Sequence, residues 1–238
     1  MNMAVIFAGG VGKRMKTNGT PKQFLRLYDK EIIIYTLELF QNNEKIDKII
    51  ISCLEEKIEY LKELIKKFNL TKVVSIVKGG NTGQESIYNA LQSAKKESIS
   101  EKDIVLIHDG VRPLILQKTI DDNIVMVETK GNSITVAPAV ETVVNIKDDK
   151  VKKILSRNEC FLARAPQSFY LRDILKCHEK AKLEKKEFID SASLMDYYGN
   201  NLNIVEGPSE NIKITTPIDF YIFKAILDAK RNIDVFGL

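Results

Sequence analysis

The sequence predicts an α/β protein with a doubly wound, mostly parallel sheet and a projecting antiparallel β-arm. Over residues 1–109, short apolar runs that suit buried strands alternate with amphipathic segments that suit helices. Glycine-rich or polar residues follow directly after three of these runs, at Ala8, Gly79 and His108-Asp109. Ligands of such sheets bind at the carboxyl ends of the strands. These three places therefore predict one site along one edge of the sheet.

The first half of the chain supplies four strands and the helices between them. Residues 3–7 form the first strand, and the glycine-rich loop follows it. The run EIIIYTLELF places Ile33, Leu37 and Phe40 on one face of a helix. In chain order the further predictions are helix 31–40, strand 46–53, helix 54–68, strand 72–77, helix 84–95 and strand 103–108.

The alternation of strands and helices ends near residue 132, where short strands follow each other without a long helix. Strands are predicted at 133–137, 142–146 and 151–155, with a turn at Lys147-Asp148-Asp149. Residues 138–160 would then form an arm whose apolar edges favour a dimer contact. The whole chain, 1–238, is expected to be one domain with this arm as its dimerisation subdomain.

The return from the arm is predicted as a turn at Ala165-Pro166-Gln167 followed by further elements. These are a helix at 171–183, a helical segment at 190–198, a strand at 202–205 and a closing helix at 218–229. Pro217 suits the first position of that last helix, where its missing N–H is not needed.

Composition excludes several classes of protein. The net charge is only +4 and the basic residues are spread among acids, so we expect no nucleic acid as partner. No apolar run approaches the length of a membrane span and no signal-peptide pattern opens the chain, so we expect a soluble cytoplasmic protein without a membrane partner. The three cysteines have no metal-ligand spacing, which suits reduced thiols.

The loop Ala8-Gly9-Gly10-Val11-Gly12-Lys13-Arg14-Met15 has the chemistry of a polyphosphate site. Glycines bring backbone N–H groups close to a ligand, and Arg14 with the later Lys22 adds positive charge. The spacing fits neither the P-loop nor the dinucleotide fingerprint, because Arg14 follows Gly12-Lys13 and Met15 replaces the third glycine. By itself the loop could also be a tight turn between strand and helix.

Asp109 follows a buried strand and is the candidate ligand for Mg²⁺, which prefers oxygen ligands and keeps several waters. His108 ends the apolar strand and is expected to be structural. His178 lies in a charged helix and is expected to be solvated. Asp190 is expected to cap the helix that follows it.

Seven motifs in one order give the chain a specific resemblance. They are Ala8-Gly9-Gly10-Val11-Gly12-Lys13-Arg14-Met15, Pro21-Lys22-Gln23, Gly79-Gly80 through Ser86, His108-Asp109-Gly110-Val111-Arg112-Pro113, Pro166-Gln167, Asp190-Ser191-Ala192-Ser193 and Asn211-Ile212-Lys213-Ile214-Thr215. Together they resemble the cytidylyltransferases that make CDP-linked polyols from CTP and a polyol phosphate. The match covers essentially the whole chain.

The resemblance implies a role for each matching residue. Cytidine would be held at Ala8, Gly9, Gly10, Gly80, Asn81 and Ser86. Arg14 and Lys22 would hold the CTP phosphates, Lys213 would add charge at the reacting α-phosphate, and Asp109 would bind Mg²⁺. The acceptor phosphate would be bound by Arg112, Thr142 and Arg157, the last two reaching across a homodimer from the arm.

Departures from the family pattern bear on the acceptor. Gly83 stands where the family usually has an arginine, and Ala165 and Ile189 each replace a threonine. These changes and the Ala-Gly-Gly loop favour ribitol 5-phosphate, with 2-C-methyl-D-erythritol 4-phosphate as the alternative. A nucleotide-binding regulatory protein and a sugar-1-phosphate nucleotidylyltransferase remain as other classes.

Overall fold

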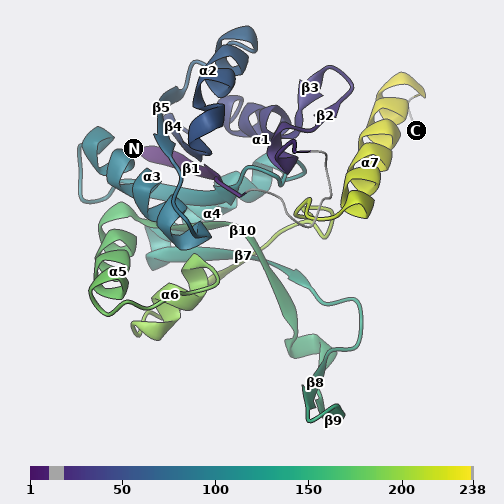
Figure 1. Ribbon diagram of the computed structural model, residues 1–238. Helices are drawn as coiled ribbons and strands as arrows, with labels where there is room; N and C mark the ends of the chain where they lie inside the picture. Colours follow the sequence, from purple (N-terminus) through teal and green to yellow (C-terminus); the bar gives the residue numbers. More distant parts are fainter. Residues whose placement is uncertain (11–18, 237–238) are drawn as a thin grey trace.

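A seven-stranded sheet forms the centre of the computed structural model, which describes residues 1–10 and 19–236 (Figure 1). The strand order is β11-β7-β10-β6-β1-β4-β5. β10 runs antiparallel to β6 and β7, and the other neighbours pair in parallel. The strands are β1 Asn2–Ala8, β4 Lys48–Cys53, β5 Val73–Lys78, β6 Ile104–Asp109, β7 Asn132–Pro138, β10 Phe161–Tyr170 and β11 Ile204–Glu206. The predicted mostly parallel sheet is confirmed.

Helices cover both faces of this sheet. Alternate residues of β1 divide between two apolar clusters, with Ile6 in one and Val5 in the other. The cluster around Ile6 receives α1 Ile32–Gln41, α2 Ile58–Lys67 and α4 Gln117–Lys130. The cluster around Val5 receives α3 Gly83–Glu97, α5 Leu171–Leu183 and α6 Ser191–Tyr197. The sheet is therefore doubly wound.

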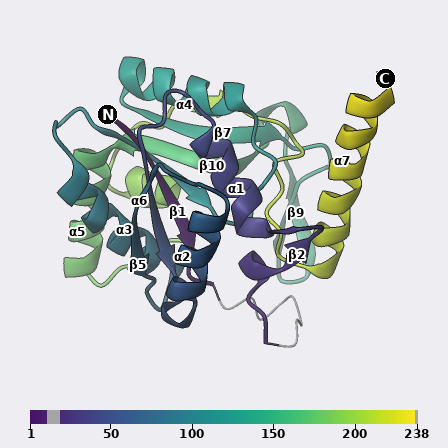
Figure 2. The same cartoon turned by 90° about the horizontal axis from the view of Figure 1, so that it is seen from above.

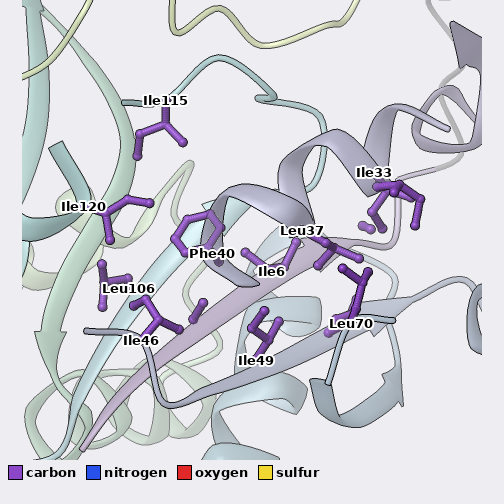
Figure 3. Close-up of a cluster of buried hydrophobic side chains, with 14 of the residues drawn as sticks. Ile6, Ile33, Leu37, Phe40, Ile46, Ile49, Leu70, Leu106, Ile115 and Ile120 are labelled. Atoms are coloured by element: carbon purple, nitrogen blue, oxygen red, sulfur yellow. The ribbon is translucent and has the colours of Figure 1, made fainter. Parts of the chain in front are cut away.

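The face predicted for the first helix is the face that packs. Figure 3 shows Leu37 and Phe40 of α1 gathered with Ile6 and Leu106 of the sheet, and all four are fully buried. Full burial of such a side chain contributes about 1.5–3 kcal/mol relative to exposure. Ile33 belongs to the same cluster, so the apolar stripe holds α1 on the strands.

The arm projects from the sheet on the ends of β7 and β10 (Figure 1). β8 Val144–Lys147 and β9 Lys150–Ile154 pair antiparallel as a separate two-stranded sheet. Asp148 and Asp149 between them have φ values of 53° and 58°, as a two-residue hairpin turn with right-handed strand twist requires. The predicted projecting arm at 138–160 is thus present.

The C-terminal helix α7 Pro217–Phe236 packs on a third, smaller cluster with the hairpin β2 Arg26–Leu27 and β3 Lys30–Glu31. Both views place α7 and α5 at opposite ends of the molecule (Figures 1 and 2). Short 3-10 turns complete the elements at η2 Lys22–Phe24, η3 Glu55–Lys57 and η4 Arg157–Glu159. Pro217 opens α7 as predicted.

Two segments differ from the prediction. No helix was expected at Gln117–Lys130, where α4 lies. The predicted turn at Ala165-Pro166-Gln167 is wrong, because these residues lie within β10, at a point where its register against β7 shifts. A proline fits inside a strand where the ladder is interrupted, because no partner strand needs its missing N–H.

Candidate active site

A cavity of about 520 Å³ lies at the carboxyl ends of the parallel strands. Its lining begins at the end of β1 with Ala8, Gly9 and Gly10, and continues after β5 with residues 79–83 and Ser86. Lys22, Asp109 and Lys213 also line it. The structure therefore brings together the predicted cytidine residues and two of the three predicted phosphate cations. Arg14, the third, lies outside the described residues.

Glycine is required at two points of the cavity wall. A Cβ atom on Gly9 would lie 2.8 Å from Ser86 Oγ, and one on Gly80 would lie 2.2 Å from Glu85 Cγ. The Gly80 N–H donates to Ser86 Oγ over 3.0 Å, and that hydroxyl donates to the Thr82 carbonyl over 2.9 Å. The buried Ser86 thus fixes the second glycine turn against the first.

The second turn leads straight into the amino terminus of α3. Thr82 caps this helix by accepting from the Glu85 N–H over 3.1 Å, and Glu85 Oε2 accepts from the Asn81 N–H over 2.7 Å. Thr82 and Glu85 thus each accept from a backbone N–H at the start of the helix, an arrangement related to a capping box but with Glu85 bonded one residue before the cap, and a helix amino terminus attracts anionic groups. Helix α3 therefore fixes the backbone of the turn at Asn81, and Asn81 lines the cavity.

Gln23 positions the glycine loop, although the motif that contains it, Pro21-Lys22-Gln23, predicted no role for this residue. Its side chain is almost fully buried, and Nε2 donates to the Ala8 carbonyl over 2.6 Å and to the Gly10 carbonyl over 3.1 Å. These two bonds hold the end of β1 and the glycine loop against η2. The neighbouring Lys22 is thereby placed on the cavity wall.

Asp109, Arg112 and Lys213 form an ionic group, of which Asp109 and Lys213 line the cavity. Arg112 Nε donates to Asp109 Oδ2 over 2.7 Å, and Lys213 Nζ lies 2.5 Å from Asp109 Oδ1. Arg112 Nη1 also donates to the Asn211 carbonyl over 2.8 Å, which ties this group to the segment that carries Lys213. Burial alone would raise the pKa of Asp109, but the Lys213 and Arg112 charges outweigh it and lower the pKa to about 2. Asp109 is therefore ionised at neutral pH.

A second cavity of about 350 Å³ adjoins the first. Both are lined by Phe7, Gly83, Asp109 and Lys213. Arg112 lines the second cavity, together with residues of β10 and of the segment that leads into α6. Ligands bound in the two cavities would both lie next to Lys213, because this residue lines both.

Two predicted acceptor residues lie apart from both cavities of their own chain. Thr142 and Arg157 are exposed on the arm and line neither one. Their predicted role would need the cavity of a second subunit.

Of the two predictions for the histidines, the one for His108 is confirmed and the one for His178 is wrong. His108 is fully buried, donates from Nε2 to the Arg112 carbonyl over 3.1 Å, and packs edge-on against Phe40, so it is structural as predicted. The prediction of a solvated His178 is wrong, because this residue is only 3% exposed and its ring stacks on Tyr88. Burial lowers the pKa of each histidine to about 4, so both are neutral at pH 7. Both His178 and Asp190 line the second cavity.

Asp190 has the structural role that was predicted. It caps α6 by accepting from the Ser193 N–H over 2.8 Å, and its other oxygen accepts from Gln167 Nε2 over 2.9 Å. Gln167 Oε1 accepts in turn from the Ala192 N–H, so β10 and α6 are locked together.

Comparison with known proteins identifies the family. A sequence profile described as "IspD: 2-C-methyl-D-erythritol 4-phosphate cytidylyltransferase" matches residues 2–229. The chain belongs to this family of cytidylyltransferases. It is accordingly an enzyme of the nucleotidyltransferase class.

Relatives in this family carry two names. A ribitol-5-phosphate cytidylyltransferase of Vibrio parahaemolyticus is 53% identical, and the match covers 100% of each chain. A 2-C-methyl-D-erythritol 4-phosphate cytidylyltransferase of Clostridium botulinum is 38% identical over 95% of this chain and 97% of its own. A solved structure of 4-diphosphocytidyl-2C-methyl-D-erythritol synthase from Anaerococcus prevotii shares the fold, with a TM-score of 0.82, 24% identity and coverage of 95% and 96%.

No helix in 1–10 and 19–236 is long and apolar enough to cross a membrane. Within the same residues, no group of three or more His, Cys, Asp or Glu side chains could hold a metal ion by itself.

Proposed function

We propose that this enzyme transfers cytidylate from CTP to D-ribitol 5-phosphate, producing CDP-ribitol and pyrophosphate. The observation that carries the proposal is the pair of cavities that adjoin at Asp109 and Lys213. The larger cavity has the glycine turns and cations suited to CTP, and the smaller one has Arg112 for a phosphorylated acceptor. The relative at 53% identity carries the ribitol name, whereas the one at 38% carries the methylerythritol name.

The chemistry needs positioning and charge more than acid–base groups. The acceptor phosphate oxygen attacks the α-phosphorus of CTP, a new P–O bond forms, and the bond to the β-phosphate breaks to release pyrophosphate. A phosphate monoester has a second pKa of about 6, so its attacking oxygen is already ionised near neutral pH. No base is therefore required, and both histidines are buried and neutral.

Each nearby residue has a part in bringing two anions together. Lys22 binds the CTP phosphates, Arg112 binds the acceptor phosphate, and Lys213 neutralises the charge that builds on the α-phosphate. Arg14 would join Lys22 at the CTP phosphates. Asp109 holds Lys213 and Arg112 toward the junction of the cavities through its two oxygens.

We include Mg²⁺ in this proposal with Asp109 as its protein ligand. The carboxylate is the one acidic side chain, among the described residues, that lines both cavities. One carboxylate fits Mg²⁺, because this ion is commonly held by one or two carboxylates with substrate phosphates and waters. When bound, Mg²⁺ would neutralise phosphate charge and orient the triphosphate.

The active enzyme is proposed to be a homodimer located in the cytoplasm. Thr142 and Arg157 are exposed on an arm that leaves the main sheet, so a partner subunit's cavity is where they would meet the acceptor phosphate. The three cysteines are free thiols, which suits a reducing compartment.

The test is pyrophosphate release with CTP and Mg²⁺, comparing two acceptors. We expect a kcat/KM for ribitol 5-phosphate at least about 100-fold above that for 2-C-methyl-D-erythritol 4-phosphate, since a site built for hydroxyls discriminates strongly. That result would place the enzyme in cell-surface polymer synthesis. The reverse preference would assign it to isoprenoid precursor synthesis, and the absence of turnover with either acceptor would contradict the cytidylyltransferase mechanism proposed above.

A further inference from the structure

The smaller cavity contains buried polar atoms that have no hydrogen-bond partner within the described part of the chain. Apart from Asp109 Oδ1, which forms an ion pair with Lys213, they are Arg164 Nε, His178 Nε2 and Ser191 Oγ. An unpaired buried polar group costs about 1–3 kcal/mol, so three of them in one wall indicate a polar ligand. None of the three was a candidate site residue in the sequence analysis.

Arg164 is directed into the cavity by the irregular part of β10. The register between β10 and β7 shifts between Ala163 and Gln167, so residues 164–166 leave the regular ladder. A register shift of this kind redirects side chains. Two buried side chains hold the segment: Thr135 Oγ1 donates to the Pro166 carbonyl over 2.7 Å, and Asn211 Nδ2 donates to the Ala165 carbonyl over 2.7 Å.

Among the described residues no acid forms an ion pair with Arg164, although Asp109 and Asp190 line the same cavity. Within residues 1–10 and 19–236, Arg164 forms no ion pair, while Asp109 is already engaged by Arg112 and Lys213. Burial lowers the pKa of the Arg164 guanidinium, and the nearby Arg112 charge lowers it further. A guanidinium carries five N–H donors and no acceptor, so this side chain needs oxygen atoms from a ligand.

Ser191 and His178 indicate which kind of ligand oxygen the smaller cavity would bind. Ser191 Oγ both donates and accepts, and a neutral imidazole nitrogen does one or the other. Neutral groups of this kind match hydroxyls, whereas Arg112 and Lys213 at the junction of the cavities match the phosphate dianion. Ala163, Ala165 and Ile87 in the same lining leave room for a carbon chain to pack.

We propose that Arg164, His178 and Ser191 bind the hydroxyl groups of the acceptor and make the enzyme selective for a linear pentitol phosphate. This inference rests on the proposed function. Ribitol 5-phosphate has one more hydroxyl than 2-C-methyl-D-erythritol 4-phosphate and has no methyl branch. The methyl-branched acceptor has a shorter carbon chain with a methyl group on it, so its three hydroxyls would not meet the three groups in the arrangement that suits ribitol 5-phosphate, and a polar group left without a partner is the basis of strong discrimination.

The position of Gly83 supports an acceptor role for Arg164. Family resemblance leads to the expectation of an arginine at residue 83, but this chain has glycine there, with no atom within 4 Å of the Cβ position. Gly83 lines both cavities. Gly83 and Arg164 both line the smaller cavity, so its guanidinium comes from β10 and not from the start of α3.

The experiment measures steady-state kinetics of the full-length enzyme with CTP, Mg²⁺ and either acceptor. For Arg164→Gln we expect KM for ribitol 5-phosphate to rise about 10- to 100-fold, KM for CTP to stay unchanged, and the preference over the methyl-branched acceptor to shrink. Ser191→Ala should raise the ribitol 5-phosphate KM about 3- to 10-fold. Arg172→Gln is the matched control, because this exposed arginine pairs with Glu101 and Asp173 and lines neither cavity.

A series of ribitol 5-phosphates lacking one hydroxyl each separates binding from a structural effect. The analogue without the hydroxyl that Arg164 contacts should be as poor a substrate for the wild type as for Arg164→Gln. Arg164→Lys, which keeps the charge, and thermal unfolding of each variant control for misfolding.

The possible failures are distinguishable. Absence of wild-type turnover with ribitol 5-phosphate would contradict the proposed function and this inference with it. Wild-type turnover together with an unchanged acceptor KM in Arg164→Gln, or equal losses for every analogue, would overturn this inference alone.

Discussion

At the scale of single residues, Asp109 combines a structural and a chemical task. Its two carboxylate oxygens engage Lys213 and Arg112, and these two cations belong to segments far apart in the sequence. The ion pairs fix where the two cavities meet. The same charges lower the pKa of Asp109 to about 2, so the carboxylate stabilises the folded state.

Asp109→Asn should therefore weaken both activity and acid-dependent stability. The folded-state pKa lies below the ordinary value of 3.8, so the stabilisation is full above pH 3.8 and is lost as the pH falls toward about 2. It amounts to about 2 kcal/mol. Between pH 5 and pH 2, the free energy of unfolding measured in urea titrations should fall by about 2 kcal/mol more for the wild type than for Asp109→Asn.

The exposed Asp149→Asn in the arm turn is the control, and its pH profile should follow the wild type. In pyrophosphate-release assays, Asp109→Asn should reduce kcat/KM by about 100- to 1,000-fold, as loss of one organising charge does in other sites. A variant with wild-type activity would contradict the placement of Asp109 at the reacting phosphates.

At the scale of elements, strands and site loops could be predicted because their signals are local. The runs before Ala8, Lys78 and Asp109 are short, apolar and followed by turn residues, and all three are strands of the parallel sheet. Helix α4 was not predicted because its apolar stripe is interrupted by Thr119 and Asn123. These polar residues are buried, since Asn123 bonds the Thr119 carbonyl and Thr135 Oγ1. Gly131, whose φ of 90° lies in the left-handed region, ends α4, and a glycine at this place is the sequence signal that could have indicated the end of a helix.

The burial of His178 could have been predicted from periodicity. Leu171, Ile174, Leu175, His178 and Ala181 follow the spacing of one helix face, and all are buried. The charged residues between them concealed the pattern. Arg164, by contrast, could not be placed, because its direction depends on a register shift held by Thr135 and Asn211 from other elements.

The arm exposes apolar residues that would be covered in the proposed homodimer. Ile146, Val151 and Ile154 are 64%, 59% and 65% exposed, which leaves an apolar patch on a two-stranded sheet. We expect Ile146→Glu with Ile154→Glu to convert a dimer into a monomer in sedimentation experiments. Because the arm contacts solvent rather than the main core, the melting temperature of the main domain should fall by only a few degrees, roughly the effect of 1 kcal/mol. Ile99→Glu, at an exposed isoleucine outside the arm, should remain dimeric.

At the scale of the whole molecule, the proposed homodimer would use the arm to build each active site from two subunits. Thr142 and Arg157 line neither cavity of their own chain, while Lys213 lines both. Each site would then combine the cavities of one subunit with the arm of the other. In a two-fold dimer this exchange is reciprocal, so two sites form from two chains.

Mixed dimers test this arrangement directly. Arg157→Ala and Lys213→Ala should each be nearly inactive alone, since each removes a cation from every site. When equal amounts are unfolded and refolded together, half of the dimers pair one chain of each kind, and one of their two sites joins an intact arm to intact cavities. About one quarter of wild-type activity should therefore return, measured as pyrophosphate release at saturating CTP. If Arg157 acted within its own chain, every site would keep one defect and mixing would restore nothing.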